Sequence, residues 1–432
     1  MTIPEGIVEI GNASFFGCKA IQNELVIPST VEYIGTGAFY NCIKMPGDIV
    51  IPEKITTVAQ LAFAGCYKLT SVSFGENLKS IGDYAFYYCE SLSGNLVIPD
   101  GVVKIGDYAF TYCGALNGKL SLGEGLTHIG VAAFAKCRSL SGNLILPNGL
   151  VHIGAAAFED CGKLTGALYL PENLEYIGDA AFNHCTGFTN TTLLIPAKVS
   201  VLGGDYKVEE NTNYSTHLFY DFGTSAFKTF FVDAANESFT ASNGVLYTAD
   251  MTRLIAYPRG KSDTVYEIPK GVTVMDELAF SKNSYLTEII LPDSYVITSD
   301  IPANALNHDA NSLSAAIYNY TGIAKVSVKD TNPNYLSENG IIYSKDKKSL
   351  WYCPSRYSGV VNLSEGTERI ENGAFYGVPG YINYTKVIIP ASTVFIHPSA
   401  VSYLNYLLPG GVEVAEGNPN YTITDEKLKA VN

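Results

Sequence analysis

The chain has 432 residues, of which 47% are hydrophobic and 16% charged, and its 42 acidic and 28 basic residues give a formal net charge of −14. This acidic balance argues against a nucleic-acid partner, which requires a basic surface, and against docking on anionic membranes. The apolar and aromatic content excludes a disordered chain. No apolar run approaches the roughly 18 residues of a membrane-spanning helix, so the sequence predicts no direct membrane insertion. The first residues show no signal peptide.

Eight of the nine cysteines recur at intervals of 23 or 24 residues. A disulfide framework or a zinc site does not space its cysteines so evenly, whereas a structural repeat does. The spacing therefore indicates a repeat of about 24 residues. The recurring cysteines are Cys18, Cys42, Cys66, Cys89, Cys113, Cys137, Cys161 and Cys185.

One copy of the repeat, Leu92–Ala115, reads LSGNLVIPDGVVKIGDYAFTYCGA, and the template is L-x-G-x-L-x-[IL]-P-x-x-[LV]-x-x-I-G-x-x-A-F-x-x-C. The alternating segment that Pro99 ends predicts a short strand. Gly106 suggests a backbone conformation that a side chain would forbid. The segment after it predicts a short helical or 3-10 turn that buries Phe110 and Cys113. Because one unit is too short to bury its own apolar face, neighbouring units must stack.

The repeated unit resembles the BspA-like class of leucine-rich repeats, also described as the Treponema pallidum type, over about residues 1–203. The resemblance implies an α/β solenoid, a leucine-rich-repeat right-handed superhelix with a parallel β-sheet on one face and short helical or 3-10 turns on the other. Coils stacked about 4.8 Å apart would pair their strands into one parallel sheet, with continuous ladders of Leu, Ile, Phe and Cys in the core.

The second half keeps the repeat in a degenerate form. Residues 204–223 break the period and are interpreted as a solvated, irregular insertion rather than a functional loop. Residues 224–432 are expected to continue the same solenoid with inserted β-hairpins. Two segments, 232–258 and 328–354, each contain Asn-Gly, an alternating strand, an Asp-centred turn and another strand, and a third copy begins at Val414. Such hairpins resemble inserts between repeats in the same family.

The sequence contains no pattern that points to catalysis. The motifs G-x-S-x-G, H-E-x-x-H, C-x-x-C and the EF-hand loop are all missing, so we predict no enzyme and no cofactor. His128 and His152 share a repeat position, but a pair of ligands is an incomplete metal site, and no metal is predicted. The cysteine ladder is interpreted as reduced, buried thiols rather than as disulfides or metal ligands. Cys353 lies outside this ladder.

The surface of the predicted sheet is the remaining candidate site. Since strand residues alternate, inward Leu96 and Ile98 place Asn95 and Val97 outward. The apolar column is defined as the outward residues next to the proline: Val26, Val50, Ser73, Val97, Ser121, Ile145, Tyr169 and Leu194. The polar column is defined as the outward residues before them: Glu24, Asp48, Ser71, Asn95, Lys119, Asn143, Ala167 and Thr192. The candidate ligand-binding residues are Asn95, Val97, Lys119, Ser121, Asn143, Ile145 and Tyr169.

Two interpretations of this face stay open. An exposed apolar face on a solenoid is typical of a binding surface. Alternatively, β-branched residues simply favour strands wherever these lie.

The resemblance implies a non-enzymatic adhesion protein of the cell surface. Its ligands would be host extracellular-matrix proteins, other cells or glycans, held by many weak contacts along the sheet. The alternative is a structural stalk or scaffold that spaces another domain from the cell envelope. We expect an extracellular or cell-surface location, with this chain a fragment or a trimmed form. The oligomeric state is left open.

Overall fold

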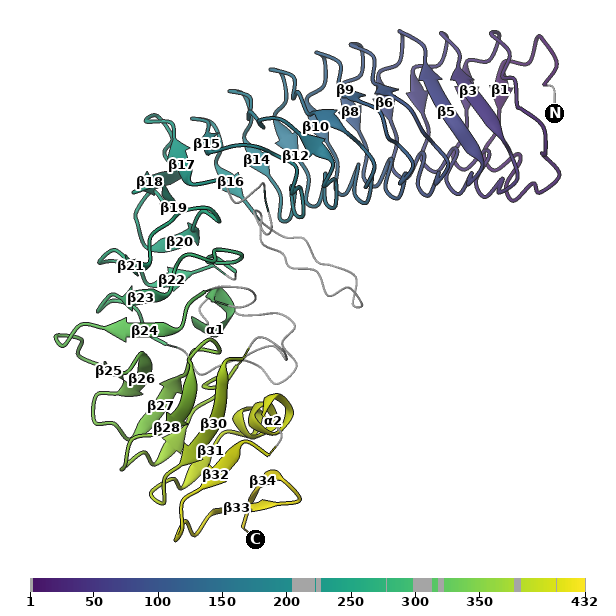
Figure 1. Cartoon of the computed structure of the whole chain (residues 1–432). Coiled ribbons are helices and arrows are strands. Elements are labelled where there is room, and N and C mark those ends of the chain that lie inside the picture. Colours follow the sequence, from purple (N-terminus) through teal and green to yellow (C-terminus); the bar gives the residue numbers. More distant parts are fainter. Residues whose placement is uncertain are drawn as a thin grey trace. The chain divides into compact units, whose positions relative to one another are not determined.

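The computed structural model describes residues 3–203, 222, 227–276, 278–297, 313–317, 322–376, 382–408 and 410–431. The chain forms two compact units, Met1–Phe239 and Thr240–Asn432, and each is described by itself (Figure 1). Most of the predicted insertion at 204–223 lies outside the described residues. The predicted boundaries, and one solenoid running through both units, stay predictions.

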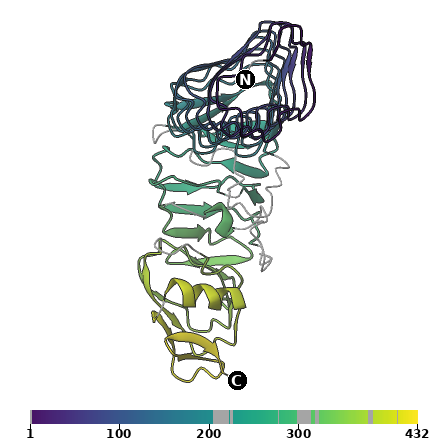
Figure 2. The same ribbon diagram turned by 90° about the vertical axis from the view of Figure 1, so that its right-hand side faces the viewer.

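Parallel coils stack through the first unit, and Figure 2 views them nearly along the stack, so that they superpose. The longest parallel ladder joins the two-residue strands that end at the Ile of the Ile-Gly step or at its counterpart. The sequence did not predict a sheet at this position. Five of the seven strands end in a buried Ile, one ends in the buried Val58, and one ends in the partly buried Leu202. A separate parallel pair, β1 (Glu9–Ile10) and β2 (Tyr33–Ile34), begins the stack. The seven strands of the long ladder are β4 (Thr57–Val58), β6 (Ser80–Ile81), β8 (Lys104–Ile105), β10 (His128–Ile129), β12 (His152–Ile153), β14 (Tyr176–Ile177) and β16 (Val201–Leu202).

A second set of short strands lies in or near the L-x-[IL]-P segment of the coils, on another side of each coil. We expected one continuous parallel sheet here, but these strands form separate parallel pairs. Glycines with positive φ, such as Gly94 and Gly142, precede or begin several of them and bend the backbone out of a regular ladder. The pairs are β3 (Gly47–Ile51) with β5 (Leu69–Phe74), β7 (Leu96–Val97) with β9 (Leu120–Ser121), β11 (Gly142–Asn143) with β13 (Leu164–Thr165), and β15 (Thr192–Ile195) with β17 (Thr229–Val232).

The segment after each Ile-Gly step is a chain of tight turns, and in the regular coils that the structure describes it forms no helix. This differs from the short helical or 3-10 turns that we expected. The reason is that the residues two before and two after each buried Phe have positive φ, for example Tyr108 and Tyr112 around Phe110. Left-handed residues interrupt a right-handed helix. The Phe110 N–H instead donates to the Ala133 carbonyl of the next coil, at 2.7 Å, so the turns also form a ladder.

The glycine of the Ile-Gly step is required by close packing between coils. The φ of Gly106 is not positive, so our conformational explanation for this residue was wrong. A Cβ added to Gly106 would lie 2.6 Å from the backbone nitrogen of Asp83 in the preceding coil. The same holds at Gly130, where a Cβ would lie 2.6 Å from the Gly106 carbonyl carbon. At this glycine, the backbones of neighbouring coils are therefore in direct contact.

The core of the first unit is a stack of phenylalanine rings. From Phe15 to Phe182, neighbouring rings lie nearly parallel, with centroids 5.2 to 5.6 Å apart. Beside them, the cysteines are free thiols, and seven of the eight in the ladder are buried as predicted. Cys18, in the first coil of the stack, is only partly buried. Burial raises the pKa of the other thiols, to about 12 for Cys89 and Cys137, so these thiols stay protonated.

The second unit contains the predicted hairpins. Two-residue Asn-Gly turns with positive φ, Asn243-Gly244 and Asn339-Gly340, lead into strands that pair antiparallel with the next strand. This is the type I′ turn chemistry that Asn-Gly favours. The hairpin strands are β18 (Phe239–Ser242), β19 (Val245–Thr248), β20 (Arg253–Ala256), β25 (Tyr335–Glu338), β26 (Ile341–Ser344), β27 (Ser349–Tyr352), β33 (Tyr421–Thr424) and β34 (Lys427–Ala430).

Parallel strands complete the second unit, with very little helix. His397 caps helix α2 (Pro398–Leu407) through its Nδ1, which accepts from the Ser399 N–H at 3.2 Å. Among the described residues, the second unit also contains helix α1 (Leu313–Ala316). The parallel strands are β21 (Val265–Glu267), β22 (Val274–Met275), β23 (Glu288–Leu291), β24 (Lys325–Val328), β28 (Gly359–Asn362), β29 (Arg369–Ile370), β30 (Tyr384–Ile389), β31 (Phe395–Ile396) and β32 (Val412–Val414).

Candidate ligand-binding face

The apolar column points into solvent, as its alternation predicted. Ile145 and Tyr169 are the most exposed, at 72% and 78%, while Leu144 and Leu168 beside them are buried. The column residues Val26, Val50, Val97 and Leu194 are also more than half exposed. Many apolar side chains are thus exposed to solvent at one repeat position. An exposed apolar patch is the first physical requirement of a contact surface, and this face has one.

The structure extends the apolar column by one residue that sequence reasoning missed. Phe231 is 55% exposed and is in register with Leu194 across the pair β15–β17. The available signal was the alternation in Thr229–Val232, where Phe230 is buried and Phe231 is not. Successive residues of which one side chain is buried and the next exposed are typical of a strand that packs against the core on one face.

An asparagine side chain replaces backbone pairing next to Tyr169. Asn190 is buried, its Oδ1 accepts from the Leu168 N–H at 2.8 Å, and its Nδ2 donates to the Leu168 carbonyl at 2.9 Å. The amide therefore satisfies both backbone groups of Leu168 as a neighbouring strand would. The backbone next to Tyr169 is thus fixed by hydrogen bonds from a neighbouring coil, which also fixes the position of the Tyr169 side chain.

The polar column contributes to the fold as well as to the surface. Asn95 Oδ1 accepts from the Lys119 N–H at 2.9 Å, so Asn95 links two coils. Asn143 lies opposite Thr165 rather than Ala167, a shift of two residues from the repeat alignment. Lys119, Ser121 and Asn143 are exposed like Asn95. Hydroxyl groups of Ser71 and Thr70 hold the pKa of Asp48 below its usual range, so its carboxylate stays ionised at neutral pH.

The histidine pair stacks and does not complete a metal site. His128 and His152 are in register, with ring centroids 5.7 Å apart, and Tyr176 stacks on His152 at 4.4 Å. Burial, and then the charge of His128, lower the pKa of His152. Within the described residues, no three His, Cys, Asp or Glu side chains are grouped so that they could hold a metal ion.

A charged cluster lies where three coils meet in the turn segment. Lys136 and Asp160, at one repeat position in neighbouring coils, lie 3.0 Å apart, and the Lys136 ammonium is 3.4 Å from Glu159. Arg138 and His184 also contact the Asp160 carboxylate, at 3.1 and 2.9 Å. The hydrogen bond with His184 is the main cause of an Asp160 pKa well below its usual range. Alternating charge at one position of successive repeats was the signal that sequence reasoning missed.

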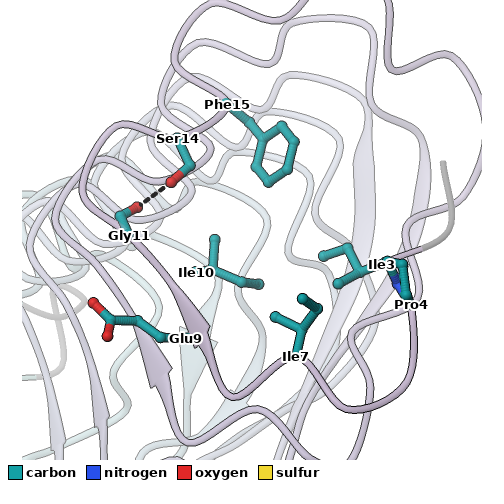
Figure 3. A pocket seen from close by; sticks show the side chains of 8 residues that line it. All are labelled: Ile3, Pro4, Ile7, Glu9, Ile10, Gly11, Ser14 and Phe15. Atoms are coloured by element: carbon teal, nitrogen blue, oxygen red, sulfur yellow. Dashed lines mark hydrogen bonds between the residues drawn. The ribbon is translucent and has the colours of Figure 1, made fainter.

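A pocket of about 270 Å³ opens at the first coil (Figure 3). Its lining is mainly apolar, with Glu9 as the one ionisable side chain. The Ser14 hydroxyl donates to the Gly11 carbonyl at 2.8 Å. Phe15 turns one ring face toward this pocket and stacks the other on Phe39. The pocket thus exposes one side of the core of this coil, and its polar side chains are those of Glu9 and Ser14.

The family described as BspA type leucine rich repeat region matches residues 1–117, 115–228 and 261–328. The chain belongs to this family. The matches span the regular coils of the first unit and part of the second, which agrees with the repeated L-x-[IL]-P and A-F-x-x-C segments of these BspA-type repeats. A comparison with curated proteins found no match.

Solved structures of bacterial leucine-rich repeat proteins resemble the chain. A leucine rich cell surface protein from Faecalibacterium prausnitzii is 22% identical, over 96% of this chain and 87% of that one, with a TM-score of 0.48. A leucine-rich repeat protein from Bacteroides ovatus is also 22% identical, over 96% and 91%, with a TM-score of 0.49. The Treponema pallidum leucine rich repeat protein is 26% identical, over 47% and 86%, with a TM-score of 0.34.

Membrane insertion was not expected from the sequence. In the part of the chain that the structure describes, every helix is too short or too polar to cross a bilayer.

Proposed function

We propose that the chain is a non-enzymatic ligand-binding protein of the cell surface, which adheres to host extracellular-matrix proteins, to other cells or to glycans through the apolar column. The observation that carries the proposal is the run of exposed apolar residues at one repeat position, which Phe231 extends. Solenoid faces commonly serve as extended binding surfaces. A structure in the comparison is described as a cell surface protein, which supports an extracellular location for this chain.

The contacts of such a ligand would be distributed over several coils. Tyr169 and Ile145 are the natural anchors, because they expose the most apolar surface. Aromatic side chains often contribute most to protein interfaces, while polar neighbours contribute complementarity. Asn95, Val97, Lys119, Ser121 and Asn143 are proposed as such neighbours. This arrangement gives many weak contacts on a rigid support and needs no chemical step.

Immobilised matrix proteins, intact cells and a glycan array test the proposal directly. We expect at least one ligand with a Kd in the micromolar range, weakened about fivefold or more by Tyr169→Ala, since a buried aromatic anchor typically contributes more than 1 kcal/mol. Tyr67→Ala, which removes an exposed tyrosine outside the apolar column, is the matched control and should leave the Kd unchanged. Binding that Tyr169→Ala leaves unchanged would assign the site to another face.

The second candidate is a stalk or scaffold that spaces another domain from the envelope. The inter-coil ladders of Phe rings and backbone hydrogen bonds favour it, because they make a rigid rod-like stack. A stalk predicts no ligand at micromolar concentration in the same screen.

A further inference from the structure

An acidic row runs beside the apolar column in the first unit. It occupies the position just after the residue that closes each strand, and every member is exposed. The corresponding place is taken by Ser29, Asn148 and Ala197 in other coils. The acidic row comprises Glu53, Glu76, Asp100, Glu124 and Glu172.

Hydrogen bonds link the acidic residues of the row in two pairs. Glu53 Oε2 accepts from the Glu76 N–H at 2.9 Å, and Asp100 Oδ1 accepts from the Glu124 N–H at 3.1 Å. These bonds cross from one coil to the next, so the residues of each pair lie one coil spacing apart, about 4.8 Å, while Asn148 separates Glu124 from Glu172 by two coils. Such spacing is well within the Debye length of about 8 Å, and like charges on neighbouring strands repel. The row thus concentrates negative charge, and a bound cation would reduce the repulsion between its carboxylates.

The basic side chains near this face neutralise the row only in part. The Lys79 ammonium lies 3.0 Å from where a Cβ of Gly101 would be, next to Asp100. Lys119 is the one basic residue in the apolar and polar columns. Lys54 forms an ion pair with Glu32 at 2.6 Å, and Lys198 donates to Asn173 at 2.7 Å. The face therefore combines exposed apolar side chains with a net negative edge, in a chain that is acidic as a whole.

We propose that the apolar column and the acidic row together dock an extended protein segment that carries both apolar and Lys or Arg side chains. The inference deepens the proposed function and rests on it, because it names the partner class of the same face. From Val50 to Tyr169 the face spans five coil steps, or about 24 Å, which equals roughly seven residues of extended chain. Apolar side chains of the partner contact the column, and its cations lie against the row. A sulfated or sialylated glycan has the wrong charge for this edge.

Synthetic peptides provide the test on the full chain. The probe is a fluorescent octapeptide of alternating Lys and Val, compared with Lys-Ser and Glu-Val octapeptides and with a heparin octasaccharide. We expect the Lys-Val peptide to bind most tightly, with a Kd that rises as NaCl increases from 0.05 to 0.5 M. The variant Glu124→Gln/Glu172→Gln should weaken it about two- to thirtyfold, because it removes two exposed charge pairs that each contribute modestly. Ile145→Ser should weaken it by a similar factor.

Two matched variants show whether the effect belongs to this face. Glu90→Gln removes an exposed carboxylate that follows Cys89 in the turn segment, and Val103→Ser removes an exposed valine outside the apolar column. Both should leave the peptide Kd unchanged. Equal losses with these controls, tighter binding of the heparin fragment, or no preference for Lys-Val over Glu-Val would overturn the inference.

The matrix and cell screen separates this inference from the proposed function. If a matrix ligand is lost with Tyr169→Ala but unaffected by Glu124→Gln/Glu172→Gln, the face binds ligands and the cationic partner class is wrong. If the ligand is lost with both changes, the inference is supported. If no ligand responds to Tyr169→Ala, the proposed function fails together with its refinement.

Discussion

The thiol of Cys137 donates a hydrogen bond to the carbonyl oxygen of Phe110 in the preceding coil, with sulfur and oxygen 3.1 Å apart. The same contact joins seven neighbouring coil pairs, with distances of 3.0 to 3.3 Å. The Phe110 N–H donates to the Ala133 carbonyl of the coil that carries Cys137, and the Phe110 carbonyl also accepts from the Cys113 N–H at 3.2 Å. The repeated cysteine therefore acts as a small apolar residue that also carries a donor.

This hydrogen bond predicts how much serine and alanine substitutions lower the free energy of unfolding at two buried cysteines, Cys137 and Cys353. At Cys137, a serine hydroxyl keeps a donor for Phe110, so we expect Cys137→Ser and Cys137→Ala to lower the free energy of unfolding by amounts within about 1 kcal/mol of each other. Among the described residues, the Cys353 thiol has the Pro354 carbonyl as its hydrogen-bond acceptor, at 4.0 Å. There serine should cost about 1–3 kcal/mol more than alanine. Urea denaturation measures both pairs, and the same serine–alanine difference at both sites would contradict the donor role.

Thiol accessibility gives a second prediction. Cys18 is partly exposed, while burial raises the pKa of Cys42 to about 11 and keeps the deeper thiols protonated. Since the thiolate is the reactive form, the native protein should titrate one fast thiol with Ellman's reagent, and all nine only in denaturant. Cys18→Ser should abolish the fast reaction. Several fast thiols in the native state would disprove the buried ladder.

The charged cluster around Asp160 predicts a loss of stability in acid. Its pKa in the folded state is below that of the unfolded chain, so its contribution is complete above a pH of about 4 and is lost as the pH falls below that value. Asp160→Asn should lower the free energy of unfolding at pH 7 by about 2–4 kcal/mol, because it removes the carboxylate nearest to the buried ammonium of Lys136.

The control for this cluster is Arg138→Gln. Arg138 is 69% exposed, so its loss should cost no more than about 1 kcal/mol. Thermal unfolding between pH 3 and pH 7 measures the two variants together with the parent chain. Equal acid sensitivity in Asp160→Asn and the parent would show that another group controls the transition.

Two equivalent asparagines in the second unit should differ in their effect on stability. Asn283 and Asn332 are both buried, and each Oδ1 accepts from two backbone N–H groups. Asn283 Nδ2 also donates to the Pro258 and Lys261 carbonyls, both at 2.9 Å. Asn332 Nδ2 has no hydrogen-bond partner among the described residues.

Asn283→Ala should therefore destabilise the second unit by about 1–3 kcal/mol more than Asn332→Ala, since it leaves the two carbonyls without their donor. Denaturation monitored by the tryptophan fluorescence of Trp351, which packs within this unit, provides the measurement. Equal losses would mean that the Pro258 and Lys261 carbonyls find other donors in the variant.

The even spacing of the cysteines made the repeat predictable, and the alternation around Pro99 predicted which strand residues are buried. Both patterns are local consequences of one coil, so a single sequence reveals them. The exposure of Val97, Ile145 and Tyr169 could likewise be predicted. Their role as ligand-binding residues is untested by the structure and stays a prediction.

Other features depend on contacts between coils, and a repeat template does not record these. The left-handed conformation of Tyr108 and Tyr112 arises because turn backbones pair with the next coil, which rules out the helix that the sequence pattern suggested. The close packing at Gly106, the amide of Asn190 and the position of Phe231 have the same origin.

The sequence by itself determined the repeat length, the family, the buried Ile, Phe and Cys positions and the Asn-Gly hairpins, because each follows from chemistry within about 24 residues. Only the tertiary structure decided which strands form a continuous ladder, where Asp160 finds its cations, and that Glu53 and Glu76 lie in one acidic row beside the apolar column. The physical reason is that stacking brings together residues one coil apart, and hydrogen bonds and charges act at those distances.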